Sequence, residues 1–151
     1  MSETVQLLNS FLRNENTAVE THRHAIGKMS GEPYVESLRE NLLAHELRVS
    51  ILRAEIIRHS GAPTEDAGVW GAFNRLLLNP SAHINEKAAI ASLEDGEDIC
   101  RGAYKREYET AVPPLRFVIR DLLAKQSRSH DLMIRLLRAS SRHAVPPSQS
   151  V

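Results

Sequence analysis

The fold of this 151-residue chain is decided by a stretch in its second quarter, VESLRENLLAHELRVSILRAEI (35–56). Side chains recur in it at steps of three and four, all apolar but one, at Val35, Leu38, Leu42, His45, Val49, Leu52 and Ile56. Such alternating steps place side chains on one face of an α-helix. Glycine and proline, which break helices, are absent from the stretch. It therefore predicts one long helix that is buried along one face.

Three further stretches step in the same way, and residues that end helices separate them. These breakers stand at Gly31-Glu32-Pro33, Gly61-Ala62-Pro63, Asn79-Pro80-Ser81 and Pro113-Pro114. The stepping runs through Val5, Leu8, Leu12, Glu15, Val19, His22 and Ile26, then Ile90, Leu93, Glu97, Cys100 and Tyr104, then Ile119, Leu123, Gln126, His130, Met133 and Leu137. No stretch alternates with a period of two for long enough to predict a strand. The sequence therefore predicts an all-α protein with helices over about 3–29, 34–60, 83–111 and 114–140.

The lengths of the junctions predict how these helices are connected. The first and last junctions are short, which makes the helices that they join antiparallel neighbours. The junction over 61–82 is long and carries an apolar periodic piece of its own, at Val69, Trp70, Phe73, Leu76 and Leu77. Two hairpins joined by a long crossover that contains a short helix make a ferritin-like four-helix bundle. We expect one domain over residues 1–141 and a disordered tail over 142–151, where periodicity ends and two prolines stand.

Composition excludes several classes of protein. Hydrophobic residues make up 42% and charged residues 25%, which is typical of a folded globular domain. The 19 basic and 19 acidic residues give a formal net charge of zero, so we expect neither nucleic-acid binding nor attraction to a membrane. Cys100 is the single cysteine, which excludes an intramolecular disulfide. No signal peptide or membrane-spanning stretch is evident, so we expect a cytoplasmic protein.

Polar side chains interrupt the apolar faces near the middle of the helices. They are Glu15, His22, His45, Glu97 and His130. Because helices of matching length bring mid-helix positions to similar height, we expect His45, Glu97 and His130 to share one layer, with Glu15 and His22 a turn to either side. Facing imidazoles and carboxylates are ligands that zinc, iron or manganese accepts. They also satisfy one another as a metal-free hydrogen-bond network, and Gln126 on the same face favours this network.

Several short motifs resemble a bacterial family of uncharacterised ferritin-like proteins, within the wider ferritin and rubrerythrin-like superfamily. The matching motifs are Leu7-Leu8-Asn9-Ser10, Gly61-Ala62-Pro63 with the following Trp70, Leu93-Glu94-Asp95-Gly96-Glu97-Asp98 with Tyr104, and Pro113-Pro114. The resemblance covers roughly residues 5–139. It implies a four-helix bundle that often self-associates, in a family whose molecular activity is mostly unassigned.

The resemblance also allows a comparison with the di-iron site of the superfamily, which takes one Glu from each of two helices and a Glu-x-x-His motif from each of the other two. By this resemblance, Glu97 matches the single Glu of the third helix, and His45 and His130 match the two histidines. The glutamates three residues before these histidines are missing, because Leu42 and Ser127 stand there.

The first helix also lacks its expected ligand. Val19 stands where the resemblance places the remaining Glu, and Glu20 is rotated about 100° around the helix. Most of the carboxylate charge that would neutralise two irons is therefore absent. We expect a non-catalytic bundle that associates with itself or with a protein partner. The alternatives are a protein with a residual single-metal site at the bundle centre and, last, a di-iron oxidoreductase.

Apolar side chains outside the inward faces predict how the bundle associates. They are Leu7, Phe11, Ile51, Ile57 and Phe117. Apolar surface of this kind often marks an interface, so we expect a homodimer or a higher assembly. A metal-free network further predicts that Glu97→Gln costs little stability, about 1 kcal/mol.

Overall fold

The computed structural model of the chain describes residues 1–29, 34–67 and 86–143. These residues form four α-helices: α1 (Glu3–Lys28), α2 (Tyr34–Arg58), α4 (Glu86–Tyr108) and α5 (Pro113–His143). They contain no strand, so the prediction of an all-α chain with four long helices is confirmed for these residues. None of the four helices has an apolar stretch long enough to cross a membrane.

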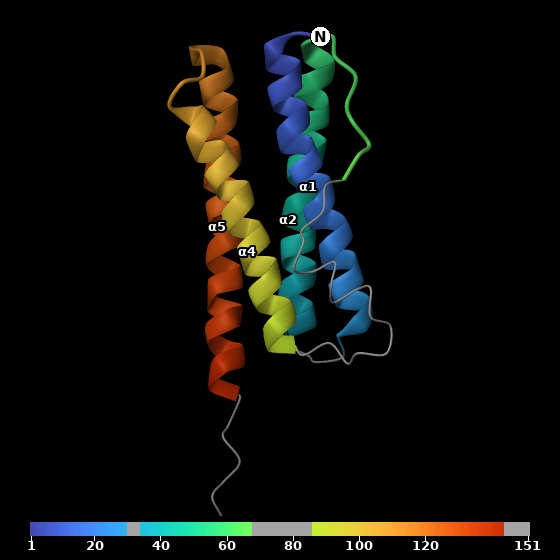
Figure 1. Cartoon of the computed structure of the whole chain (residues 1–151), viewed down its shortest axis with the longest axis vertical. Helices are drawn as coiled ribbons and strands as arrows, with labels where there is room; N and C mark the ends of the chain where they lie inside the picture. The colour runs from blue at the N-terminus through green and yellow to red at the C-terminus, as the bar shows by residue number, and fades with distance from the viewer. Residues whose placement is uncertain (30–33, 68–85, 144–151) are drawn as a thin grey trace, which may run out of the picture.

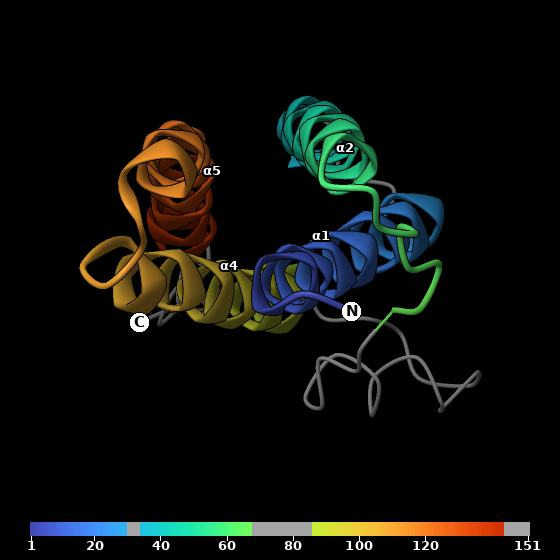
Figure 2. The same ribbon diagram turned by 90° about the horizontal axis from the view of Figure 1, so that it is seen from above.

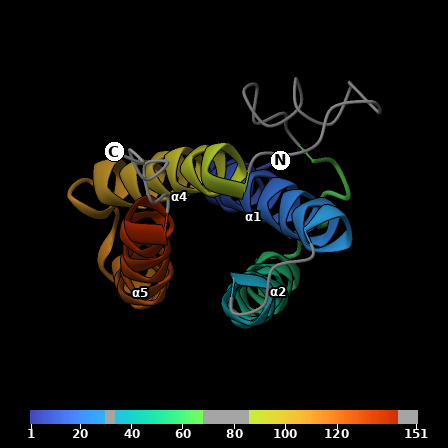
Figure 3. The same ribbon diagram turned by 90° about the horizontal axis from the view of Figure 1, so that it is seen from below.

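The helices pair as two antiparallel hairpins. α1 packs along α2, and α4 packs along α5 (Figure 1). The hairpins meet mainly through α1 and α4, whereas α2 and α5 approach one another less closely (Figure 2, Figure 3). α2 ends beside the start of α1, and α4 begins at the opposite end of the bundle, so α2 and α4 run in the same direction (Figure 1).

The observed helix ends differ from the predicted ones by at most three residues. Ser2 caps α1, because its hydroxyl accepts a hydrogen bond from the Val5 amide at 3.2 Å. α5 starts on Pro113, whose fixed φ suits the first turn of a helix. It continues to His143, so the first two residues of the predicted tail are helical. The rest of that tail, 144–151, and the short crossover helix predicted around 69–77 lie outside the described residues.

Two asparagines of α1 fix the first part of the connection that follows α2. Asn9 Nδ2 donates to the Ala62 carbonyl at 3.1 Å, and Asn9 Oδ1 accepts from the Thr64 amide at 2.8 Å. Asn16 Nδ2 donates to the carbonyls of Thr64 at 3.3 Å and Asp66 at 3.1 Å. Because Asn16 follows Asn9 by about two turns, the chain leaves α2 and runs along α1 toward the end of α1.

Gly61 permits the close contact between this connection and the start of α1. A Cβ atom at Gly61 would lie 2.6 Å from Cγ1 and 2.8 Å from Cγ2 of Val5, which is closer than such atoms approach. The turn itself is made one residue earlier, where Ser60 has a φ of 59°. The breaker seen in the sequence is therefore a packing glycine, and the left-handed residue is a serine.

The core consists of two apolar clusters with a polar layer between them. One cluster lies near the start of α1 and includes Leu8, Leu12, Leu52 and Ile119. The other lies near the start of α2 and includes Leu38, Ile90, Leu93 and Met133. The buried polar side chains between them include Glu15, His22, Asn41, His45, Arg48, Glu97 and Gln126. Apolar packing above and below therefore holds these polar groups away from solvent.

Only some of the apolar side chains predicted to lie outside the core are exposed to solvent. Ile57 and Phe117 are exposed, as predicted. Leu7 and Ile51 are half-buried. The prediction for Phe11 is wrong, because this side chain is only 2% exposed. Its ring packs against Tyr104 with the ring centroids 4.6 Å apart. Phe11 thus belongs to the core and is not available to an interface.

Candidate functional site

Four of the five polar side chains predicted to meet in the core do meet. Glu15 and His22 come from α1, His45 from α2 and Glu97 from α4, and all four are fully buried. Apolar residues toward both ends of each helix, such as Leu38 and Leu52 of α2, pack into the two clusters. This packing fixes the rotation of each helix, so the polar side chain between the apolar ones must point inward.

His45 lies between the two carboxylates. Its Nδ1 is 2.6 Å from Glu15 Oε2, and its Nε2 is 2.5 Å from Glu97 Oε1. An imidazole with a carboxylate at each nitrogen donates to both when it carries both protons. Burial disfavours the charged ring, but the carboxylates of Glu97 and Glu15 outweigh burial and raise the pKa of His45 to about 9. His45 is therefore an imidazolium at neutral pH.

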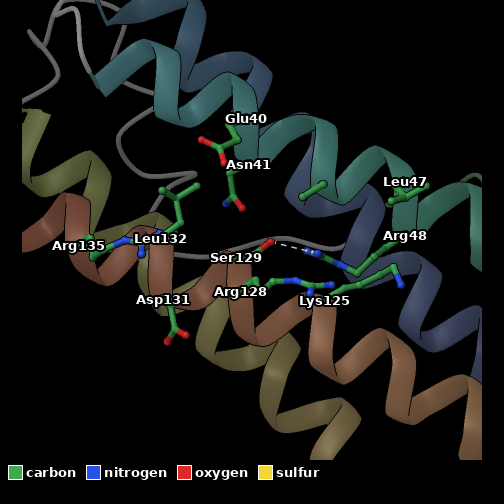
Figure 4. Close-up of a pocket in the computed structure, with 11 residues that line it drawn as sticks. Glu40, Asn41, Leu47, Arg48, Lys125, Arg128, Ser129, Asp131, Leu132 and Arg135 are labelled. Atoms are coloured by element: carbon green, nitrogen blue, oxygen red, sulfur yellow. Dashed lines mark hydrogen bonds between the residues drawn. The ribbon is translucent and has the colours of Figure 1, made fainter.

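A second buried cation, Arg48 of α2, lies beside Glu15. Its Nε donates to Glu15 Oε1 at 2.8 Å, and its Nη1 donates to the Ser129 hydroxyl of α5 at 3.0 Å (Figure 4). Burial opposes the charge, but Glu15 and then Glu97 outweigh it and raise the pKa of Arg48 above its usual value. Arg48 Nη2 also lies 2.8 Å from His45 Nδ1. Both groups are donors, so they do not hydrogen-bond to each other. Glu15 accepts a hydrogen bond from each of them and thereby holds the two cations side by side.

Glu15 accepts a third hydrogen bond from Tyr104, whose hydroxyl lies 2.8 Å from Oε1. Burial raises the pKa of a carboxyl group, but the charges of Arg48 and His45 outweigh burial and lower the pKa of Glu15. Burial, followed by the charge of Glu15, raises the pKa of Tyr104 well above its usual value. The Tyr104 hydroxyl therefore stays protonated and donates to an ionised carboxylate.

Glu97 is surrounded by donors on both oxygens. Asn41 Nδ2 donates to Oε1 at 2.7 Å, alongside His45. Gln126 Nε2 donates to Oε2 and also lies 3.3 Å from the Glu97 carbonyl. Burial raises the pKa of this carboxyl group, but His45, followed by His22 and Arg48, outweighs burial and lowers the pKa of Glu97 to about 2. Glu97 is therefore an anion at any pH at which the protein is ordinarily handled.

His22 is the neutral member of the group. Its Nδ1 donates to the Ala18 carbonyl at 2.7 Å, and its Nε2 accepts from Asn41 Nδ2 at 2.9 Å. Burial, followed by the charge of His45, lowers the pKa of His22 to about 4. Asn41 thus donates to both His22 and Glu97, which fixes the orientation of its amide. Asn41 Oδ1 is left buried without a hydrogen-bond partner among the described residues.

The formal charges of this network cancel. Glu15 and Glu97 contribute two negative charges, and His45 and Arg48 contribute two positive charges. A lone charge in a bundle core is too costly, whereas paired and hydrogen-bonded charges are tolerated there. The network therefore supplies its own counterions from side chains.

The prediction that His130 joins the other four residues is wrong. Its Nε2 lies 3.1 Å from Glu94 Oε1 and 3.6 Å from Asp98 Oδ1, both on α4. α5 presents Gln126 and Ser129 to the centre instead. His130 follows Ser129 by one residue, a rotation of about 100° that directs it to the flank of α4.

Among the residues that the structure describes, one set of side chains could hold a single metal ion. His22, His45 and Glu97 each offer one ligand atom, and these atoms lie within 4.8 Å of one another. A metal ligand must be unprotonated at the binding atom, so His45 would have to release the proton that it donates to Glu97. Asn41 would also have to leave Nε2 of His22.

A di-iron centre does not fit these residues. It needs several carboxylates whose negative charge neutralises the metals. Glu15 and Glu97 are the two carboxylates of the network, and the charges of Arg48 and His45 already neutralise them. The guanidinium of Arg48 lies directly against Glu15, where a second metal would need free carboxylate oxygens.

Two members of the network, Asn41 and Arg48, are absent from the predicted inward face of α2. The predicted face runs through the apolar residues Leu42 and Val49, which are only half-buried. The observed face follows Val35, Leu38, Asn41, His45, Arg48, Leu52 and Ile56. It has the same three-and-four stepping, so periodicity alone did not separate the two faces. The signal that could have done so is electrostatic, because two buried carboxylates require buried cations.

No family model matches the sequence, and no curated protein matches it. The function of the buried centre therefore has to follow from the chemistry of its own residues.

Proposed function

We propose that this chain is a ferritin-like four-helix bundle in which a charged side-chain network stands in place of a metal centre, and that it is a non-catalytic protein that self-associates. The observation that carries the proposal is the cancellation of charge between Glu15, Glu97, His45 and Arg48. A site whose carboxylates are already paired with an arginine and an imidazolium has no charge left for a cation to neutralise. It stabilises the bundle and sets the register of its helices instead.

The course of the chain supports the ferritin-like topology. α2 and α4 run in the same direction, so the connection between them has to span the length of the bundle (Figure 1). Its first residues already run along α1, bonded to Asn9 and then to Asn16. Two antiparallel hairpins joined in this way are the arrangement of ferritin-like proteins, and an up-down-up-down bundle would join α2 to α4 by a short turn.

An apolar stripe on the outer face of α2 supports self-association. Leu43, Leu47 and Ile57 are 65%, 53% and 62% exposed. The residues lie within about 40° of one direction around the helix, so they form one stripe along the bundle surface. Exposed apolar side chains that line up on one helix are typical of helix–helix interfaces between protein chains. A second copy of the chain, carrying the same stripe, matches it by two-fold symmetry.

Sedimentation velocity over a range of micromolar concentrations tests the association. We expect a species of twice the 16.9 kDa chain mass, reduced to one chain mass by the double change Leu43→Glu and Ile57→Glu. Ile99→Glu is the matched control, because Ile99 is 56% exposed but lies on α4. A wild-type chain that sediments at 16.9 kDa at every concentration contradicts the proposed function.

The second candidate is a single-metal protein, favoured by the proximity of His22, His45 and Glu97 ligand atoms. Metal analysis of protein purified without an affinity tag separates the two. The charge-neutral network predicts far less than one equivalent of iron, zinc or manganese, and no change in melting temperature with chelator. A stoichiometric metal that chelator removes, with a fall of many degrees in melting temperature, would establish the second candidate.

A further inference from the structure

A pocket between α2 and α5 lies beside the buried network. These two helices are set apart on the open side of the bundle (Figure 2), and the pocket between them has a volume of about 460 Å³. Pockets that take small molecules generally have volumes of this order. Arg48 and Ser129, hydrogen-bonded to each other, cross the space between the helices at its floor (Figure 4).

The α5 wall of the pocket carries two arginines that pair with none of the residues at 1–29, 34–67 and 86–143. Arg128 and Arg135 are exposed, and neither makes an ion pair or hydrogen bond with any residue in the described part of the chain. The other cations of the lining are already paired, Lys125 with Asp121 at 2.7 Å and Arg48 with Glu15 at 2.8 Å. Arg128 and Arg135 are seven residues apart, so they share a face and lie about 10 Å apart along the helix.

Two acidic residues also belong to the lining but do not neutralise these arginines. Asp131 points away from α2, and Glu40 lies at the rim on the α2 side (Figure 4). Neither makes an ion pair with Arg128 or Arg135. The pocket thus presents free positive charge to a molecule that enters between the helices.

The remaining lining is apolar except for one unsatisfied acceptor. The apolar lining residues are Ala44 and Leu47 of α2 and Leu132 of α5, and Leu132 lies between the two arginines in the sequence of α5. Asn41 Oδ1 is buried and has no hydrogen-bond partner among the described residues. Its amide extends from α2 toward α5 at the floor of the pocket (Figure 4). A buried acceptor of this kind normally finds a donor, and the residues that the structure describes supply none here.

We propose that this pocket binds an amphipathic organic anion. Its negatively charged group pairs with Arg128 or Arg135, and its apolar body lies against Ala44 and Leu132. A hydroxyl or amine part way along the molecule donates to Asn41. An arginine binds a carboxylate or sulfonate through two parallel hydrogen bonds. We therefore expect an uncharged molecule of the same shape to bind more weakly.

Fluorescence titration of the full chain with 1-anilinonaphthalene-8-sulfonate is the first test. This probe combines a sulfonate, aromatic rings and an amine donor. We expect saturable binding of one probe per chain, and displacement by decanoate at a concentration about tenfold below that required for decanol, because only decanoate carries the charge. Equal displacement by decanoate and decanol would show non-specific apolar binding and overturn the proposal.

Variants place the binding in this pocket. Arg128→Gln combined with Arg135→Gln changes only exposed side chains, so the helical content stays the same while the affinity for decanoate falls about tenfold. Arg106→Gln, at an exposed position of α4, is the matched control and keeps wild-type affinity. Ala44→Phe fills the pocket and abolishes binding in a chain that keeps its helical content. Wild-type affinity in the double arginine variant contradicts the proposal whatever the behaviour of Ala44→Phe.

Discussion

Glu15 and Glu97 are carboxylates at the same depth in one core, yet the protein neutralises them in different ways. Glu15 accepts from Arg48, His45 and Tyr104. Glu97 accepts from His45 and from two neutral amides. The positive charge beside Glu15 is thus permanent, whereas the nearest positive charge beside Glu97 is a proton that can leave.

The difference separates structural strength from sensitivity to pH. A guanidinium stays charged throughout the working range of pH, so the Glu15 side of the network is fixed. An imidazolium next to two carboxylates is stable only below its raised pKa, so the Glu97 side responds to alkaline pH. His45 joins both sides, and removing either of its partners changes the balance for the other.

Arg48→Ala should have the largest effect on stability. It leaves Glu15 with His45 as its only cation, gives the core a net negative charge and opens a cavity in place of a fully buried side chain. We expect a loss of about 5 kcal/mol, measured by urea unfolding.

Arg39→Ala is the matched control, because Arg39 is an exposed arginine of the same helix. It should change the free energy of unfolding by less than about 0.5 kcal/mol. A comparable loss in both variants would mean that Arg48 acts through helix propensity and not through Glu15.

Glu97→Gln should cost about 4 kcal/mol, in contrast to the small cost predicted from the sequence alone. The substituted amide places its NH₂ group against His45 and Asn41 on one side, or against Gln126 on the other, and all of these are donors. It also leaves the core with a net positive charge. Asp95→Asn, an exposed change on the same helix, serves as the control, and equal urea midpoints for the two variants would refute this account.

Stability should be greatest near pH 6.5 and should fall as the pH rises from there. The pKa of His45 is about 9 in the folded chain and 6.5 in the absence of its partners, so its stabilising effect is complete below pH 6.5 and lost through pH 9. This change amounts to roughly 3 kcal/mol by linkage. Unfolding measured in urea at a series of pH values checks it, and stability that is flat or rising between pH 7 and 9 would contradict it.

Stability should also fall at acidic pH, and other groups cause this fall. The pKa of His22 is lowered from 6.5 to about 4 in the folded chain. As the pH falls from 6.5 to 4, His22 is therefore protonated in the unfolded chain before it is protonated in the folded chain, and stability decreases. The pKa of Glu97 is lowered from 4.5 to about 2, so its stabilising effect is lost as the pH falls through that window.

Tyr104→Phe should have the smallest effect, about 1.5 kcal/mol. It removes one hydrogen bond to Glu15 and keeps the ring that packs on Phe11. Because Arg48 and His45 still neutralise Glu15, the midpoint of the alkaline transition should not move. Tyr108→Phe on the same helix is the control, and a shifted transition in Tyr104→Phe alone would contradict this prediction, because it would show that the Tyr104 hydroxyl controls the charge of His45.

The helices could be predicted from the sequence because glycines, prolines and capping residues mark their ends. Glu15, His22, His45 and Glu97 could be predicted because each interrupts an apolar face on both sides. The face of α2 could not be resolved, since a path through Asn41 and Arg48 and one through Leu42 and Val49 have the same stepping. Hydrophobicity favours the path through Leu42 and Val49, whereas the buried carboxylates require the path that contains Arg48.

His130 illustrates a second limit of periodicity. From Gln126, steps of three and four lead to Ser129 and His130, and both are buried. Which of the two faces the centre depends on how α5 rotates against α4 and on the distance to α2. These quantities are set by the packing of whole helices, so the local sequence does not contain them.

The central claim is that His45 is a charged side-chain counterion and not a metal ligand. Nitrogen NMR of the full chain labelled with ¹⁵N-histidine tests it directly, because the ring nitrogens of an imidazolium, a neutral ring and a metal-bound ring have different shifts. We predict two protonated ring nitrogens for His45 at pH 7, titrating near 9, and a neutral His22 protonated on Nδ1, with both spectra unchanged by zinc or chelator. A neutral His45 at pH 7, or one whose Nε2 shift changes on addition of zinc, would contradict the claim.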